Sequence, residues 1–163
     1  VDCPWLQPNV YTFSSLMNAW VKSKHVDAPE EVERILEQMF HLHLQHGWDV
    51  APNQVTYSTA IDAWAKVGRV DRVEQLLQDM HAAYKEIGLE QLKPNLPAFN
   101  GLLVALARAG EMDRAESMLQ QMEDLYDAGE LEAPPGVISY STVLDAFAKS
   151  KERGSASRAE TIL

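Results

Sequence analysis

The chain has 163 residues, of which 46% are apolar and 23% are charged, a balance typical of a folded soluble protein. No apolar run approaches the roughly 20 residues that a membrane-spanning helix needs, so we expect no membrane insertion. The formal net charge of −10 weighs against binding that relies on overall attraction to phosphates. Cys3 is the only cysteine, which excludes an intramolecular disulfide and a metal site with several thiolates.

Two helical motifs alternate along the chain and recur about every 42 residues. The first occupies residues 11–22, 55–66, 97–108 and 138–149, with an aromatic residue at Phe13, Tyr57, Phe99 and Tyr140. The second occupies residues 32–39, 73–80, 115–122 and, truncated, 159–163. Such a period is typical of a helical solenoid, whose units stack on their neighbours. We expect an all-α, right-handed α-α superhelical solenoid of helix-turn-helix repeats, with units at 10–53, 54–95, 96–136 and 137–163, the last one truncated.

Local signals mark the ends of the second helix in each unit. Aspartates that suit a helix start occur at Asp27, Asp71 and Asp113. Glycines that suit a C-terminal cap occur at Gly47, Gly88 and Gly129, well beyond the second motif. Proline-containing loops at 51–53, 93–95 and 133–136 then stop each helix and lead to the next unit. The second helices are therefore expected to be long.

Nothing in the sequence has the pattern of a catalytic or metal site. A glycine-rich phosphate loop, a nucleophile elbow and a metal-binding carboxylate cluster are all missing. The spacing of His41, His43 and His46 does not stack three imidazoles on one helical face, so we interpret them as a solvated helix end. Trp20 and Trp64 share one repeat position and are expected to pack in the core. We expect no enzyme activity, no cofactor and no metal.

Residues 52–71, followed by Leu76, Leu77 and Met80, closely resemble the pentatricopeptide repeat. The resemblance covers essentially the whole chain, whereas the signatures of the tetratricopeptide repeat are missing. The spacing of the aromatic residues gives units of 41 to 44 residues, longer than the family unit, with most of the excess after the methionine of the second helix. This excess leaves the first helices unchanged but bears on the pitch of the superhelix.

The resemblance implies that the first helices line a groove for single-stranded RNA and that each repeat contacts one base. The implied base-reading pairs are Ser14 with Asn53, Ser58 with Asn95, and Asn100 with Gly136, while Ser141 opens a fourth pair. The residues implied to pack between bases are Tyr11, Val55 and Ile138, with Pro97 as an atypical fourth. By the family's pairing rules the RNA core is adenine, adenine, then a pyrimidine.

A cation follows nine residues after each aromatic: Lys22, Lys66, Arg108 and Lys149. The resemblance implies that these side chains contact phosphate. The four first-helix segments, at 9–23, 53–68, 95–110 and 137–151, carry five basic and two acidic residues, a net charge of +3 that leaves −13 on the rest of the chain. A lysine in the last turn of a helix also complements the helix dipole, so both interpretations stay open.

The function implied by the resemblance is single-stranded RNA binding in the RNA metabolism of mitochondria or plastids, in processing, stability or translation. The alternative is a structural subunit or protein-docking solenoid in a large organellar assembly such as a ribosome. Steep weakening with salt would favour RNA, whereas an apolar protein interface would be less affected.

Overall fold

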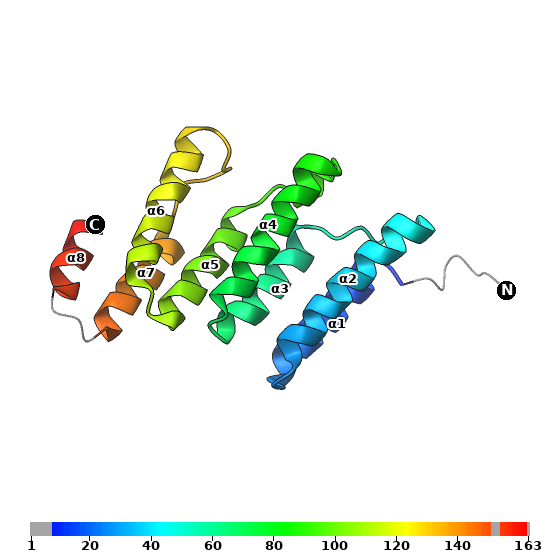
Figure 1. Cartoon of the computed structure of the whole chain (residues 1–163), viewed down its shortest axis with the longest axis horizontal. Coiled ribbons are helices and arrows are strands. Elements are labelled where there is room, and N and C mark those ends of the chain that lie inside the picture. Colours follow the sequence, from blue (N-terminus) through cyan, green and yellow to red (C-terminus); the bar gives the residue numbers. More distant parts are fainter. Residues whose placement is uncertain (1–7, 151–153, 163) are drawn as a thin grey trace.

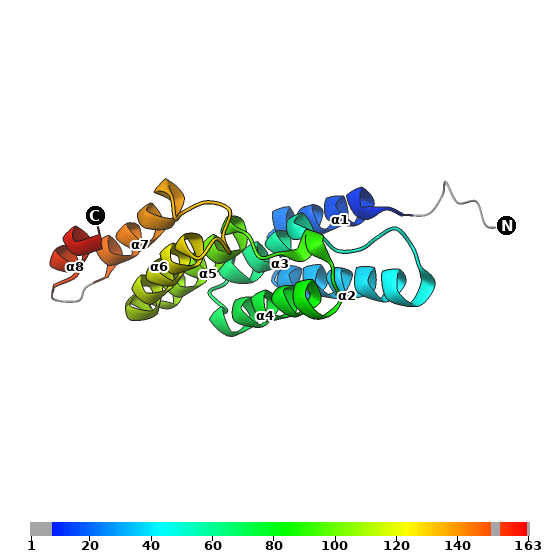
Figure 2. The same ribbon diagram turned by 90° about the horizontal axis from the view of Figure 1, so that it is seen from above.

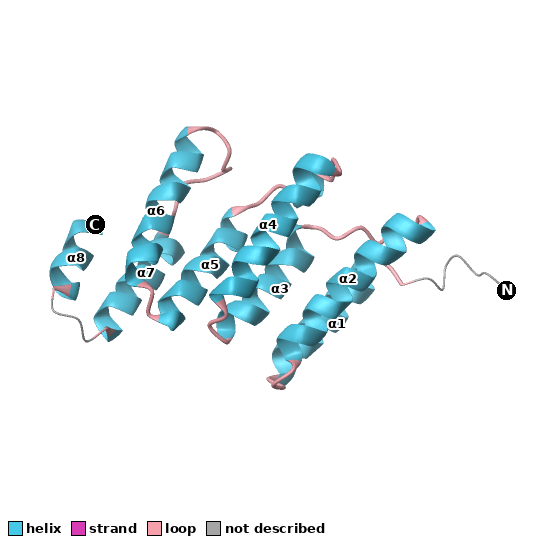
Figure 3. Ribbon diagram, in the orientation of Figure 1, coloured by secondary structure: helices cyan, strands magenta, loops and turns pink. Residues whose placement is uncertain are grey.

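The computed structural model describes residues 8–150 and 154–162 (Figures 1 and 3). They form the α-helices α1 (Val10–Ser23), α2 (Ala28–His46), α3 (Gln54–Lys66), α4 (Val70–Glu86), α5 (Leu96–Ala109), α6 (Met112–Asp127), α7 (Val137–Lys149) and α8 (Ser155–Ile162), with a short 3-10 helix, η2 (Glu90–Leu92), after α4. The described residues contain no β-strand. The expected all-α helical repeat solenoid is therefore confirmed.

The helices form an extended array of two layers. In the inner layer α1 contacts α3, α3 contacts α5, and α5 contacts α7. Each of the outer helices α2, α4 and α6 packs between the inner helix before it and the inner helix after it. Figure 2 shows α1 and α3 along one side of the array and α2 and α4 along the other. The first helices of successive units thus form one continuous surface.

The core lies between the two layers and follows the sequence period. Met39, Met80 and Met122, which share one repeat position in the outer helices, are fully buried. Tyr57 and Trp64 of α3 are buried as well, and the Trp64 indole N–H donates to Glu33 Oε2 on α2 at 2.7 Å. Each such apolar side chain stabilises the fold by ~1.5–3 kcal/mol relative to an exposed one. Trp64 therefore belongs to the core, as expected.

The outer helices are longer than the inner ones, at 19, 17 and 16 residues for α2, α4 and α6. Gly47 caps α2 in the left-handed conformation, with φ of 65°, and its N–H donates to the carbonyl of His43 at 3.1 Å. Gly88 and Gly129 lie just beyond α4 and α6 with φ of 76° and 73°. The residues beyond the family unit thus lengthen the outer layer.

The aspartates at the starts of the outer helices do not act as side-chain caps. Asp27 occupies the N-cap position of α2 without a side-chain cap bond, and Asp71 and Asp113 lie one residue inside α4 and α6. The Asp71 carboxylate instead accepts from Arg69 at 2.8 and 2.9 Å. A negative charge in the first turn still favours the helix through its dipole, so the aspartates lie at helix starts, as expected, but stabilise them by charge and not by a side-chain cap.

Ion pairs join successive outer helices at one repeat position. Arg72 of α4 pairs with Glu33 of α2, Arg114 of α6 with Glu74 of α4, and Arg158 of α8 with Glu116 of α6. Each arginine therefore neutralises a carboxylate of the preceding unit. The links are partly exposed and screened by solvent, so each adds only little to the stability of the fold.

Candidate functional site

The surface of the inner layer holds a pocket of about 340 Å³ where α1, α3 and α5 meet. Its lining comprises Asn18, Gln54, Val55, Ser58, Thr59, Asp62, Asn95 and Pro97. Residues 55, 58, 59 and 62 lie on one face of α3 because of their three- and four-residue spacing. Asn95 is the N-cap of α5. The helices thus bring Ser58 and Asn95, 37 positions apart in the chain, into one pocket beside Val55.

The Ser58 hydroxyl is a buried, unsatisfied group of this pocket. Its Oγ is buried and has no hydrogen-bond partner, the only such buried side-chain atom in the described residues. Ser14, at the same repeat position in α1, instead donates to the Val10 carbonyl at 2.8 Å. A buried polar atom without a partner costs ~1–3 kcal/mol, so a bound group that reaches Ser58 would recover part of that cost.

The asparagines of the first two predicted pairs also cap helices. Asn53 Oδ1 accepts from the N–H groups of Val55 and Thr56 at 3.0 and 3.1 Å, and Asn95 Oδ1 accepts from Ala98 at 3.2 Å. Neither Asn53 Nδ2 nor Asn95 Nδ2 has a hydrogen-bond partner within the described chain. Each side chain therefore has its acceptor used by the helix and its donors available to a ligand.

Sequence reasoning missed this capping role, although a signal for it is present. An asparagine followed three residues later by threonine occurs at Asn9 and again at Asn53, and both pairs form reciprocal caps. The Thr56 hydroxyl accepts from the Asn53 N–H at 2.9 Å. This is the arrangement of a capping box, which fixes the angle at which the chain enters the helix.

The third predicted pair differs from the first two. Gly136 is the N-cap residue of α7 and has no side chain to offer. Asn100 Oδ1 accepts a hydrogen bond from the Ser139 hydroxyl of α7 at 2.7 Å. The Ser141 side chain, which opens the fourth pair, is exposed.

The residues expected to pack between bases are open to solvent. Tyr11, Val55 and Ile138 expose 82%, 58% and 66% of their surface. Apolar side chains exposed at one repeat position are suited to contact with flat apolar rings, and Tyr11 offers a ring of its own for stacking.

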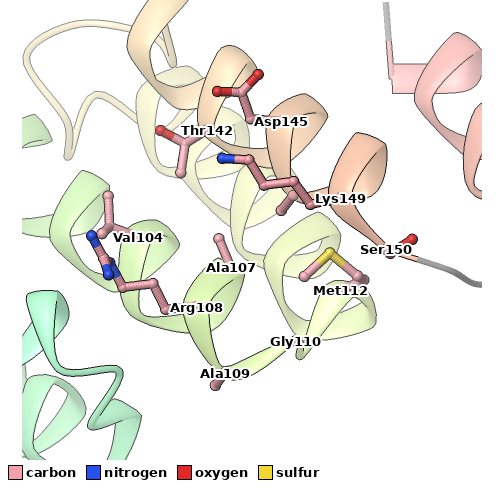
Figure 4. A pocket seen from close by; sticks show the side chains of 11 residues that line it. Val104, Ala107, Arg108, Ala109, Gly110, Met112, Thr142, Asp145, Lys149 and Ser150 are labelled. Carbon is pink, nitrogen blue, oxygen red and sulfur yellow. The ribbon is translucent and has the colours of Figure 1, made fainter.

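The four predicted phosphate-contacting cations are all exposed, but their surroundings differ. Lys66 pairs with Asp62, one turn earlier on α3, at 2.7 Å. Arg108 and Lys149 line a second pocket of about 600 Å³ between α5 and α7, together with Asp145 (Figure 4). In the described chain Lys22, Arg108 and Lys149 have no ion-pair partner.

The arginines of the two layers differ in whether they form ion pairs. Arg34, Arg69, Arg72, Arg114 and Arg158 lie in the outer helices or at their starts, and each pairs with a carboxylate. Among the arginines that the structure describes, Arg108 on the inner layer alone lacks one. The charge of the outer arginines is neutralised locally, whereas the inner layer keeps positive charge available to a ligand.

Comparison with known proteins agrees with this geometry. The PPR repeat family models match residues 48–81 and 97–126. The first segment covers α3 and most of α4, and the second covers most of α5 and α6. The chain is a pentatricopeptide repeat protein. It is similar to the crystal structure of the pentatricopeptide repeat protein PPR10 from maize, with a TM-score of 0.67 and 21% identity.

That match covers 96% of this chain and 20% of the maize chain, so this chain spans about a fifth of its length. Identity this low shows a shared fold. No curated protein matches the chain. In the described residues no helix is long and apolar enough to cross a membrane, and no cluster of three or more metal-ligating side chains occurs among them.

Proposed function

We propose that this pentatricopeptide repeat chain binds single-stranded RNA along its inner layer, with one base per repeat. The observation that carries the proposal is the pocket that joins Ser58 and Asn95, since it combines an unpartnered hydroxyl with a free amide donor. Unpaired cations lie further along the same layer, where a phosphate backbone would run. Catalytic activity forms no part of the proposal.

The hydrogen-bonding capacity of the second pair suits adenine. Asn95 Nδ2 has hydrogens to donate, because its Oδ1 is used by the helix cap. Ser58 Oγ has no partner and can accept. Adenine presents an acceptor at N1 and a donor at N6 on its Watson–Crick edge, which complements this pair. In the first pair the Ser14 proton is used by Val10, which leaves its lone pairs to accept in the same way.

The third pair has less to offer. Gly136 contributes no side chain and Asn100 Oδ1 already accepts from Ser139, so the Asn100 Nδ2 group is the main donor left for the base. A pyrimidine is the expected third base, which gives an adenine, adenine, pyrimidine core. By its family the chain is proposed to act on transcripts in mitochondria or plastids, in processing, stability or translation; fractionation of cells that carry the tagged protein tests the compartment.

A titration across a salt series tests the proposal. We expect the chain to bind a single-stranded RNA with this core, and log K to fall with log salt with a slope of about −2 to −3 for three to four phosphates at ~0.7 each. Arg108→Gln should reduce the slope by ~0.7, whereas Arg114→Gln, its control in the outer layer, should leave the slope unchanged. Failure of the unaltered chain to bind at low salt would contradict the proposal.

The second candidate is a protein-docking solenoid within an organellar assembly. The observation that favours it is a pocket of about 670 Å³ between α4, the loop before α5 and the end of α6. Its lining includes Leu77, Tyr84, Phe99, Leu125 and Leu131. An apolar lining suits a protein side chain better than a phosphate. Binding to a protein partner that resists salt, without RNA binding, would favour this candidate.

A further inference from the structure

Ser139, in the first turn of α7, uses its hydroxyl twice. The side chain is fully buried, at 0% exposed. Its Oγ accepts from the Gly136 N–H at 3.3 Å and donates to Asn100 Oδ1, on α5, at 2.7 Å. A backbone N–H can only donate, so the single hydroxyl hydrogen stays available for Asn100. In the structure this hydrogen is directed to Asn100 Oδ1, which orients the amide with its Nδ2 away from Ser139.

The fixed amide has a consequence on the inner layer. Asn100 lies on the same helical face as Pro97, three residues before it, and as Val104 and Arg108, four and eight residues after it. Its Nδ2 has no partner among the described residues. The third unit therefore offers a ligand the two hydrogens of Asn100 Nδ2, while Ser139 occupies one of the two lone pairs of Oδ1.

No other described unit has this link. The residue equivalent to Ser139 is Thr56 in α3, and its hydroxyl turns back to the Asn53 carbonyl at 2.8 Å. In α5 it is Ala98, which has no hydroxyl, and Ser58 of the preceding unit is left without a partner. The bond between Ser139 and Asn100 thus distinguishes the third unit from its neighbours.

We propose that Ser139 is a positioning residue that sets the choice between uracil and cytosine at the third base. This inference rests on the proposed RNA binding. The two pyrimidines have the same ring and differ in donors and acceptors: position 3 is N–H in uracil and a bare nitrogen in cytosine, and position 4 is a carbonyl in uracil and an amino group in cytosine. A side-chain amide that is free to turn over can match either pattern, whereas a fixed amide matches one better.

The test compares Ser139→Ala, which removes the hydroxyl, with Ser139→Thr, which keeps it. Both variants and the unaltered chain are titrated with two RNAs that differ only by uracil or cytosine at the third base. We expect the unaltered chain and Ser139→Thr to distinguish the two RNAs by about five- to tenfold. In Ser139→Ala that ratio should fall below about twofold, with the preference at the second base unchanged.

Three outcomes would overturn the inference. Equal affinity of the unaltered chain for uracil and cytosine would show that the amide orientation does not select the base, and so would an unchanged ratio in Ser139→Ala. The third outcome needs no RNA: the Asn100 side-chain amide signals are compared between the unaltered chain and Ser139→Ala in nitrogen-15 NMR spectra. If Ser139→Ala leaves them where they were, the hydroxyl does not hold the amide. Absence of any RNA binding by the unaltered chain would instead refute the proposed function, and the base choice with it.

Discussion

The close approach of α3 and α5 at Gly101 gives a stability prediction with a defined magnitude. A Cβ added at Gly101 would lie 2.3 Å from Ile61 Cγ2 and 3.6 Å from Ile61 Cβ. Unstrained carbon contacts lie at ~3.5–4.0 Å, so Gly101→Ala needs more than an ångström of relief. Ile61 is 1% exposed and, being branched at Cβ, has little freedom about χ1. The helices must therefore separate, or Ile61 must take a poor rotamer.

Two effects of opposite sign decide the size of the change. Overpacking a core costs ~1–3 kcal/mol, and the short distance at Gly101 favours the upper end of that range. Replacement of glycine by alanine inside a helix stabilises it by ~1 kcal/mol. We expect Gly101→Ala to lower the free energy of unfolding by about 1–2 kcal/mol, measured by urea unfolding followed by circular dichroism.

A double-mutant cycle isolates the clash. Ile61→Ala removes Cγ2 and by itself should cost ~2–5 kcal/mol through the cavity that it leaves. In that background Gly101→Ala should be stabilising, because only its helix propensity and some filling of the cavity remain. If Gly101→Ala instead stabilises the unaltered chain by ~1 kcal/mol, as at an open helical site, the close packing of α3 and α5 is refuted.

Three further predictions concern charge. Asp62→Asn should release Lys66 and make the salt dependence of RNA binding steeper by up to ~0.7 in slope; an unchanged slope in the same titration would speak against a phosphate contact by Lys66. Arg114→Ala should lower the free energy of unfolding by ~0.2–1 kcal/mol at low salt and by less at high salt, and a loss that is equal at both would argue against its ion pair with α4. The hydrogen bond from Arg69 lowers the pKa of Asp71 from 3.8 to about 2, so the stabilisation from this carboxylate is complete above pH 3.8 and lost as pH falls through 2. Carboxyl NMR titration should show the pKa of Asp71 returning toward 3.8 in Arg69→Ala, and a pKa that stays near 2 would refute this cause.

The fold was accessible from the sequence because the signals that specify it are local and repeated. The methionines at 39, 80 and 122 share one repeat position, and all three are fully buried. Helical spacing decides which side of a helix is apolar, and a fixed period requires each unit to meet its neighbour in the same way. The length of the outer helices could also be predicted, because Gly47, Gly88 and Gly129 recur at one place in each unit and mark where each outer helix ends.

The candidate site was accessible only in part. The resemblance to the family placed Ser58 and Asn95 together, and the structure shows them in one pocket; their contact with a base stays a prediction. The bond between Asn100 and Ser139 joins residues 39 positions apart, and the register of α5 against α7 decides whether these side chains meet. The Lys66 pair with Asp62 lies within one helix at a favourable spacing, so a closer inspection of α3 would have found it.

The most direct test of RNA recognition changes the second base and its predicted readers together. Fluorescence anisotropy would compare RNAs with each of the four bases at the second position, for the unaltered chain and for a Ser58→Ala, Asn95→Ala double variant. Ser117→Ala, on the outer face of α6, is the matched control, since its hydroxyl bonds only the Asp113 carbonyl of its own helix. The account predicts that adenine binds tightest to the unaltered chain and to the control, and that the double variant loses this preference. Affinity that is the same for all four bases in the unaltered chain, or a preference that survives in the double variant, would contradict base recognition by Ser58 and Asn95.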